Sequence, residues 1–209
     1  MGVWGAAPGV GTGRGGGGAS HTHGGTDELT RDPDRGGPDR YEGQVPALLG
    51  PPPLPDGRIG PTCLSQWWPS PFTVDGKHYA TAEHWMMAAK ARLFDDPEAE
   101  RTILAAAHPA QAKKAGRQVR RFDEATWRRE RFTVVVEGSL HKFTAHADLR
   151  GFLLNTGDRV LVEASPVDRV WGIGLAAGDE GALDPERWRG PNLLGFALME
   201  ARRRLRAAA

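Results

Sequence analysis

The amino-acid composition changes sharply near residue 58, and this change limits how much of the chain can fold. Residues 1–58 are dense in Gly, Pro and charged side chains and contain few large apolar ones. Such a segment cannot bury enough apolar surface to offset the entropy lost on ordering. We therefore predict a disordered tail and Pro-rich linker over residues 1–58 and a single folded domain over residues 59–209.

The charges of the chain nearly cancel, with 27 Lys and Arg against 26 Asp and Glu. No global field draws the protein to DNA or to an acidic membrane, although a local basic pocket could bind a small anion. The apolar runs fall far short of the roughly 20 residues that a bilayer requires. Cys63 is the single cysteine, so the chain can form neither an internal disulfide nor a cysteine metal cluster. We expect a cytoplasmic protein with no membrane partner, metal or cofactor.

Hydrophobic spacing and turn residues predict a mostly helical α+β domain with a small sheet. The sequence alternates around Asp75-Gly76, which is typical of a β-hairpin. Residues 132–136 have strand propensity and Gly138 weakens a helix, but apolar residues three and four apart favour a helix there. Residues 159–165 and 169–175 are the other predicted strands. Helices are expected, with Thr81, Pro97, Pro109 and Asp123 at helix starts, over residues 82–94, 97–107, 109–120, 124–143, 147–156 and 192–206.

Several common catalytic signatures are absent. The sequence has no Walker A motif, no G-x-S-x-G, no H-E-x-x-H and no Cys/His metal spacing. Residues 172–177 match a relaxed dinucleotide pattern, but a loop-like segment follows where that fold requires a helix. Carboxylates and aromatic residues therefore remain as the candidates for chemistry.

Glu83 lies in the first turn of the helix expected over residues 82–94, and its position allows two interpretations. A helix dipole favours an anion there, which is the better explanation for an isolated helix; the alternative is an active-site acid. Lys90 follows two turns later on the same face, roughly 10 Å along the axis. Glu83 and Lys90 could therefore line one groove without touching.

Three further residues are candidates for binding or catalysis. Glu163 interrupts an apolar alternation, so it is either a member of an ion pair or a site residue. Trp171 lies at a change from strand to loop, and its flat ring suits a nucleobase. Arg117 could bind a phosphate, or it could lie on a solvated helix face.

Four colinear blocks of the sequence together carry a family resemblance. They are "SQWWPSPFTVDGKHYATAEHWMMAAKA", "PAQAKKAGRQVRRFDEATW", "LVEASPVDRVWGIGL" and "WRGPNLLGFALMEAR". In this order they resemble the NADAR (NAD- and ADP-ribose-associated, YbiA-like) family over about residues 62–206. The resemblance implies a mainly helical N-glycosidase fold with catalytic roles for Glu83, Trp127 and Trp171. The implied substrate-binding residues are Lys90, Arg117, Gly172 and Asn192.

The resemblance also implies a choice of substrates. Some members hydrolyse the ribosyl C–N bond of phosphoribosylamino-pyrimidine intermediates of riboflavin biosynthesis, which releases ribose 5-phosphate and limits metabolite damage. Others remove ADP-ribose from guanine bases, so ADP-ribosylated nucleic acid is a possible partner. A riboflavin-type member has an aspartate where this chain has Ile173. Either Asp168 or Glu163 takes over the role of this aspartate, or the aspartate is not essential, or the substrate differs.

Three functions follow from this reading of the sequence. The first is hydrolysis of phosphoribosylamino-pyrimidines, and the second is hydrolysis of ADP-ribosyl-guanine. The third is a non-catalytic module that binds NAD or ADP-ribose, which the missing aspartate would favour. Because the chain retains Glu83, Trp127 and Trp171, we rank the two hydrolase functions above the binding module. The sequence indicates no particular oligomeric state.

Overall fold

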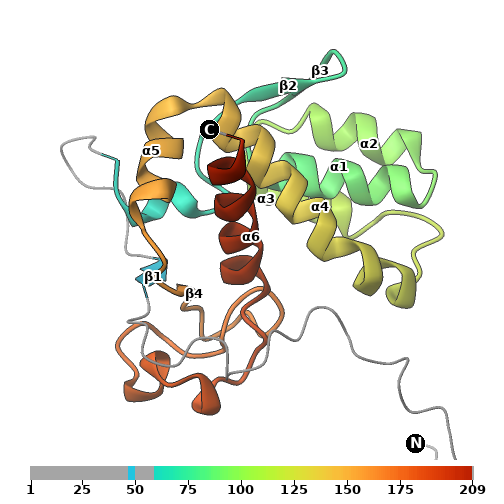
Figure 1. The fold of residues 1–209 in the computed structure, drawn as a ribbon. Coiled ribbons are helices and arrows are strands. Elements are labelled where there is room, and N and C mark those ends of the chain that lie inside the picture. The colour runs from blue at the N-terminus through green and yellow to red at the C-terminus, as the bar shows by residue number, and fades with distance from the viewer. Residues whose placement is uncertain (1–46, 50–58, 209) are drawn as a thin grey trace, which may run out of the picture. The chain divides into compact units, whose positions relative to one another are not determined.

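Helices form most of the domain, as the sequence predicts. The computed structural model describes residues 47–49 and 59–208. The tail and linker predicted over residues 1–58 lie outside the described residues, apart from Ala47–Leu49, which form strand β1. The six α-helices match the six predicted ones to within a few residues at their ends (Figure 1): α1 (Ala82–Leu93), α2 (Pro97–Leu104), α3 (Pro109–Gly116), α4 (Glu124–Ala145), α5 (Ala147–Asn155) and α6 (Leu193–Ala207).

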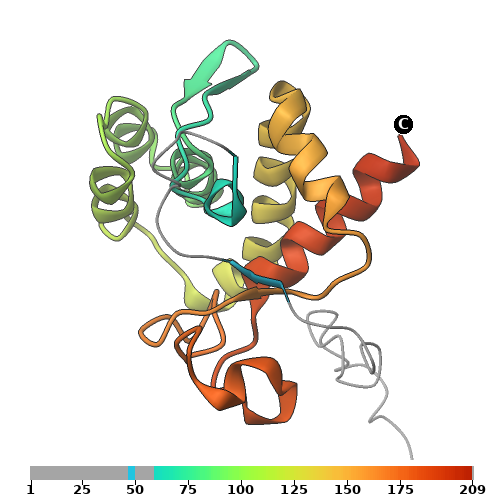
Figure 2. The same cartoon turned by 90° about the vertical axis from the view of Figure 1, so that its left-hand side faces the viewer.

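The strands pair into two small two-stranded sheets. Strands β2 (Phe72–Val74) and β3 (Lys77–Tyr79) form the predicted antiparallel hairpin. Asp75 and Gly76 between them have φ angles of 49° and 74°, as a type I′ turn requires. Strand β4 (Leu161–Glu163) pairs in parallel with β1. The two sheets lie at opposite ends of the helical body (Figures 1 and 2), so the domain is α+β and predominantly helical.

The prediction of a strand over residues 169–175 is wrong, because this segment is a loop. Its apolar composition reflects burial: Ile173 is fully buried, and its N–H donates to the carbonyl oxygen of Glu163 (2.9 Å). Gly172 permits this approach, since a Cβ there would lie 2.7 Å from the same oxygen. Gly174 follows with a φ of 68°, which an extended strand does not contain. The loop therefore packs against the end of β4 without joining a sheet.

Helix α1 is enclosed by the other helices. Its small and apolar residues leave almost no polar face, and nine of its twelve residues are buried, so it must be surrounded by other elements. Two glycines allow close packing against it. A Cβ on Gly116 of α3 would lie 2.2 Å from Sδ of Met87, and one on Gly138 of α4 would lie 2.4 Å from Cδ1 of Trp85. Gly138 therefore serves the packing of α4 instead of interrupting it.

A buried lysine ties the segment before the hairpin to α4. Lys142 is completely buried. Its Nζ donates to the carbonyl oxygens of Cys63 (2.6 Å) and Ser65 (2.8 Å). Burial lowers the pKa of Lys142 to about 7. Cys63 belongs to the short 3₁₀ helix η2 (Pro61–Leu64), so Lys142 fixes the backbone that leads to residues 66 and 67.

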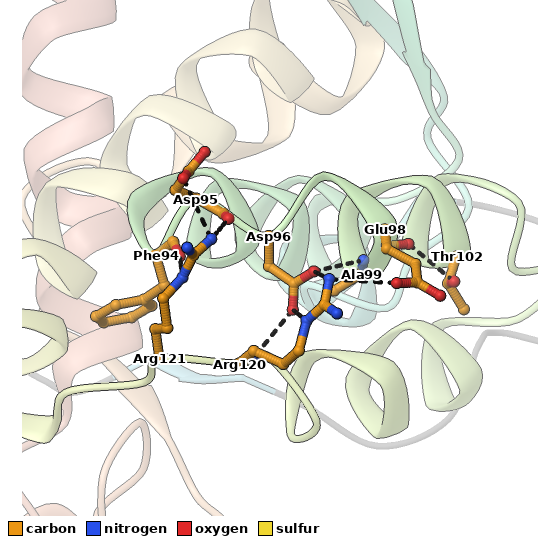
Figure 3. Close-up of polar contacts among 8 residues, drawn as sticks. All are labelled: Phe94, Asp95, Asp96, Glu98, Ala99, Thr102, Arg120 and Arg121. Carbon is orange, nitrogen blue, oxygen red and sulfur yellow. Dashed lines mark hydrogen bonds and ion pairs between the residues drawn. The ribbon is translucent and has the colours of Figure 1, made fainter.

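A second anchor joins the start of α2 to the segment after α3 (Figure 3). Asp96 is buried and caps α2 by accepting from the N–H of Ala99 (3.2 Å). The same carboxylate accepts from the backbone N–H (2.9 Å), Nε (3.2 Å) and Nη2 (2.8 Å) of Arg120. Hydrogen bonds from Arg120 hold the pKa of Asp96 well below its usual range. This network fixes the chain just after Arg117, a predicted site residue.

We predict that Asp96→Asn lowers the melting temperature by several degrees at neutral pH. The substitution removes the negative charge that pairs with Arg120 and that caps the start of α2. A lowered folded pKa means that the contribution of Asp96 is present above its ordinary value of 3.8 and is lost as the pH falls below it. The melting difference between variant and wild type should therefore narrow at about pH 3.

Glu98→Gln is the matched control for thermal unfolding followed by circular dichroism. It removes only an exposed ion pair to Arg120 (3.2 Å), and such pairs contribute little. Equal melting losses in the two variants would contradict the anchoring role of Asp96.

Candidate active site

A pocket of about 270 Å³ lies beside the first turn of α1. Four of the five residues predicted as catalytic line it. Glu83 comes from α1, Glu163 from the end of β4, and Asp168 and Trp171 from the loop after β4. The tertiary structure therefore brings together residues from distant parts of the sequence. The other lining residues are Ser65, Gln66, Trp67, Met86, Met87, Lys113 and Leu194.

Glu83 is almost completely buried, with 2% of its surface exposed. Burial raises the pKa of Glu83 to about 7, while Lys113, a hydrogen bond from Trp67 and the charge of Arg117 oppose the rise. Its Oε1 atom has no hydrogen-bond partner among the described residues. A carboxylate that served only the helix dipole would gain nothing from burial. The surroundings of Glu83 are those of a reactive acid or base.

Glu163 and Asp168 add two more carboxyl groups to the pocket. Burial raises the pKa of Glu163 to about 7, and the negative charge of Asp168 adds to the rise. The negative charge of Asp168 also raises the pKa of Glu83, so Asp168 acts on both glutamates. Oδ1 of Asp168 accepts from the N–H groups of Val170 (2.9 Å) and Trp171 (2.8 Å). Asp168 therefore shapes the loop that presents Trp171.

Lys90 and Trp127 lie together outside the lining of this pocket. The Nζ of Lys90 is 4.1 Å from the ring centroid of Phe122 and 5.7 Å from that of Trp127. Burial lowers the pKa of Lys90; Glu124 opposes this effect, and the positive charge of Arg117 adds to it. Because Arg117 acts on both Glu83 and Lys90, these residues form one electrostatic system along α1.

Two predicted substrate-binding residues make contacts within the fold. Asn192 is fully buried, with its Oδ1 accepting from the N–H of Glu163 (2.9 Å) and its Nδ2 donating to the carbonyl of Leu161 (2.8 Å). Asn192 therefore holds the end of β4 that carries Glu163. Gly172 is buried against the backbone of Glu163 and Asp168. The Ile173 side chain lies in a hydrophobic cluster with Val160 and others.

Sequence reasoning predicted none of the other seven lining residues as site residues, among them Gln66, Trp67 and Lys113. Gln66 and Trp67 lie beside Glu83 because the N–H of Glu83 donates to the carbonyl oxygen of Gln66 (2.9 Å). Lys113 of α3 reaches the same pocket, and its Nζ lies 5.9 Å from the Trp67 ring centroid. Gln66 precedes two tryptophans and belongs to no pattern with helix or strand spacing, so the sequence did not indicate that it lines the pocket.

Two further findings concern the described residues alone. No three His, Cys, Asp or Glu side chains in residues 47–49 and 59–208 form a group that could hold a metal ion. Among the helices that the structure describes, none is both long and apolar enough to cross a membrane.

The folded domain is similar to known proteins over most of its length. The model of the NADAR domain family matches residues 58–206. An N-glycosidase of Acanthamoeba polyphaga mimivirus is 40% identical over 150 residues, covering 69% of this chain and 88% of the relative. The N-glycosidase YbiA of Escherichia coli (strain K12) is 33% identical over 135 residues, covering 65% of this chain and 76% of YbiA. The NMR structure of the Escherichia coli protein YbiA is similar with a TM-score of 0.62 and 28% identity, covering 79% of this chain and 87% of that one.

The raised pKa of Glu83 predicts a pH-dependent effect of Glu83→Gln on stability. An acid with a folded pKa of about 7, against an ordinary 4.5, destabilises the fold increasingly as the pH rises between these values. The full cost, about 3 kcal/mol at most, is present above the folded pKa. We expect Glu83→Gln to raise the melting temperature relative to wild type by several degrees more at about pH 8 than at about pH 5.

Glu130→Gln, which alters an exposed carboxylate of α4, should show no such pH dependence in the same melting experiment. An identical Glu83→Gln effect at both pH values would mean that the Glu83 carboxyl titrates normally.

Proposed function

The chain belongs to the NADAR domain family, and we propose that it hydrolyses the ribosyl C–N bond of phosphoribosylamino-pyrimidines in the pocket around Glu83. N-glycosidases are among its relatives, so hydrolysis of an N-glycosyl bond is the coarser activity on which this proposal builds. The observation that supports the site is the burial of Glu83 with an unpartnered Oε1, beside Glu163 and Asp168.

The two carboxyl groups with raised pKa values can act as a general base and a general acid. Cleavage of the C–N bond builds oxocarbenium character on the ribose, which a carboxylate close to the anomeric carbon stabilises. In the proposed mechanism, the Glu83 carboxylate has this role and accepts a proton from the attacking water. Protonated Glu163 donates its proton to the departing nitrogen of the base. Water oxygen bonds to the anomeric carbon as the C–N bond breaks, so ribose 5-phosphate and the free base are the products.

The carboxylates of Glu163 and Asp168 offer a physical reason why Ile173 is compatible with turnover. Both line the pocket, whereas residue 173 lies in the hydrophobic cluster behind the loop. The charge that other members place at that position is therefore supplied here by neighbouring residues. This proposal favours a hydrolase over a module that only binds ADP-ribose.

A cationic region suits the phosphate end of the substrate. Lys113 lines the pocket, and Arg117 at the end of α3 acts electrostatically on Glu83 and on Lys90 of α1. Lys90 and Trp127 lie beyond the pocket lining, which would suit the longer ADP-ribose and so supports ADP-ribosyl-guanine as the second candidate substrate. The nearby arginines offer less for a nucleic-acid strand, since Arg120 is paired with Asp96.

Glu83→Gln is expected to lower kcat/KM by at least about 100-fold on the true substrate while the protein stays folded. The assay compares release of ribose 5-phosphate from phosphoribosylamino-pyrimidines with release of ADP-ribose from ADP-ribosylated guanine. The full chain is run with both substrates, and Glu130→Gln is the matched control. Full turnover by folded Glu83→Gln would overturn the role of Glu83. Inactive wild type on both substrates would overturn the proposed function.

Lys90→Met and Arg117→Met should raise KM about tenfold for a phosphorylated substrate and change kcat little, because a charge-assisted contact to phosphate is lost. Lys90→Met should leave turnover of the matching riboside that lacks phosphate unchanged, whereas Arg117→Met should also change the pH dependence of that turnover, because Arg117 lowers the pKa of Glu83. Lys114→Met, an exposed lysine of α3 outside the pocket lining, is the control. Equal losses on phosphorylated and unphosphorylated substrates would place the phosphate elsewhere.

A further inference from the structure

Buried polar atoms without a hydrogen-bond partner gather at the pocket. Five such side-chain atoms occur among the residues that the structure describes, and three of them belong to Gln66 and Glu83. They are Oε1 and Nε2 of Gln66 and Oε1 of Glu83. Gln66 is only 7% exposed and lines the pocket. Leaving a buried amide unpaired is unfavourable, and native proteins rarely do so without a reason.

The backbone around Gln66 is fixed on both sides. Its carbonyl oxygen accepts from the N–H of Glu83 (2.9 Å). The preceding carbonyl oxygens, those of Cys63 and Ser65, accept from the buried ammonium group of Lys142. The Gln66 side chain is therefore held beside Glu83 by contacts that do not involve its own amide. Such an arrangement is typical of a preorganised binding group.

We propose that Gln66 recognises the leaving base through a pair of hydrogen bonds to one edge of its ring. Its Oε1 accepts from a ring N–H and its Nε2 donates to the adjacent ring carbonyl. This inference rests on the proposed function, since it assigns the base of the same substrate to the same pocket. It makes Gln66 a residue that determines specificity for bases with a lactam edge.

The other polar groups of the pocket suit the same kind of base. Glu83, Glu163 and Asp168 present carboxyl oxygens, which accept hydrogen bonds from ring N–H and amino groups when ionised. Gln66 is the one carboxamide side chain in this lining, and its unpartnered Nε2 can donate to a ring carbonyl. A base that lacks the lactam edge would leave the Gln66 amide buried and unpaired, which is how polar sites reject analogues.

Binding of the isolated base tests this inference without any need for turnover. Calorimetry would measure the affinity of diaminopyrimidinone, which has a lactam edge, and of its ring-N-methyl derivative, in which that edge is blocked. Wild-type protein should bind the unmodified base at least about tenfold more tightly. Gln66→Met, which keeps an unbranched side chain but removes both polar atoms, should bind the two compounds about equally.

Three controls separate recognition from structure. Gln66→Glu keeps the shape and cannot donate once it is ionised, so at a pH of about 9, well above the pKa values of the buried glutamates, it too should lose the preference. Ser139→Ala removes another unpartnered buried polar atom, on α4 outside the pocket lining, and should keep the wild-type preference. Ribose 5-phosphate should bind wild type and Gln66→Met equally, since Gln66 contacts only the base.

The outcomes distinguish this inference from the proposed function. If wild type shows no preference for the unblocked base, or if folded Gln66→Met and Gln66→Glu both retain it, the role of Gln66 is wrong even when the enzyme hydrolyses its substrates. If the preference depends on Gln66 but no N-riboside is hydrolysed, base recognition stands and the proposed activity fails.

Discussion

The enclosure of α1 is the constraint on which the rest of the structure depends. Nine of its twelve residues are buried, and α2, α3 and α4 pack on it, with close contacts at Gly116 of α3 and Gly138 of α4. Any polar residue on such a helix is carried into the interior with it. Glu83 is therefore buried because of its neighbours along the helix, and its raised pKa follows from that burial.

Two buried charged side chains, Lys142 and Asp96, fix the backbone before Gln66 and after Arg117. Lys142 binds carbonyl oxygens of the segment before Gln66, and Asp96 binds Arg120 shortly after Arg117. Each of these contacts joins parts of the chain that are distant in sequence. Neither contact uses a polar side-chain atom of the pocket lining. Rigid walls with unpaired polar side chains suit a site that must recognise one ligand edge and position one bond.

The charges around the pocket are arranged in two regions. Glu83, Glu163 and Asp168 contribute carboxyl groups to the pocket lining and Lys113 contributes a cation, whereas Lys90 and Arg117 carry positive charge outside the lining. Such a division matches a substrate with an amino-substituted base and an anionic phosphate. It also places two carboxyl groups with pKa values near neutrality close to the proposed scissile bond, where one can accept and the other donate a proton at the same pH.

The sequence by itself determined the local structure and the family. Helix spacing, the Asp75-Gly76 turn and the helix-start residues depend on neighbours in the chain, and all of them agree with the structure. Residues 169–175 were misread because burial and strand pairing favour the same apolar side chains. Only the tertiary structure decided that Glu83 is a buried acid and not a helix-start charge, and that Gln66 and Lys113 reach its pocket. Burial and electrostatic coupling arise between distant residues, which no local pattern records.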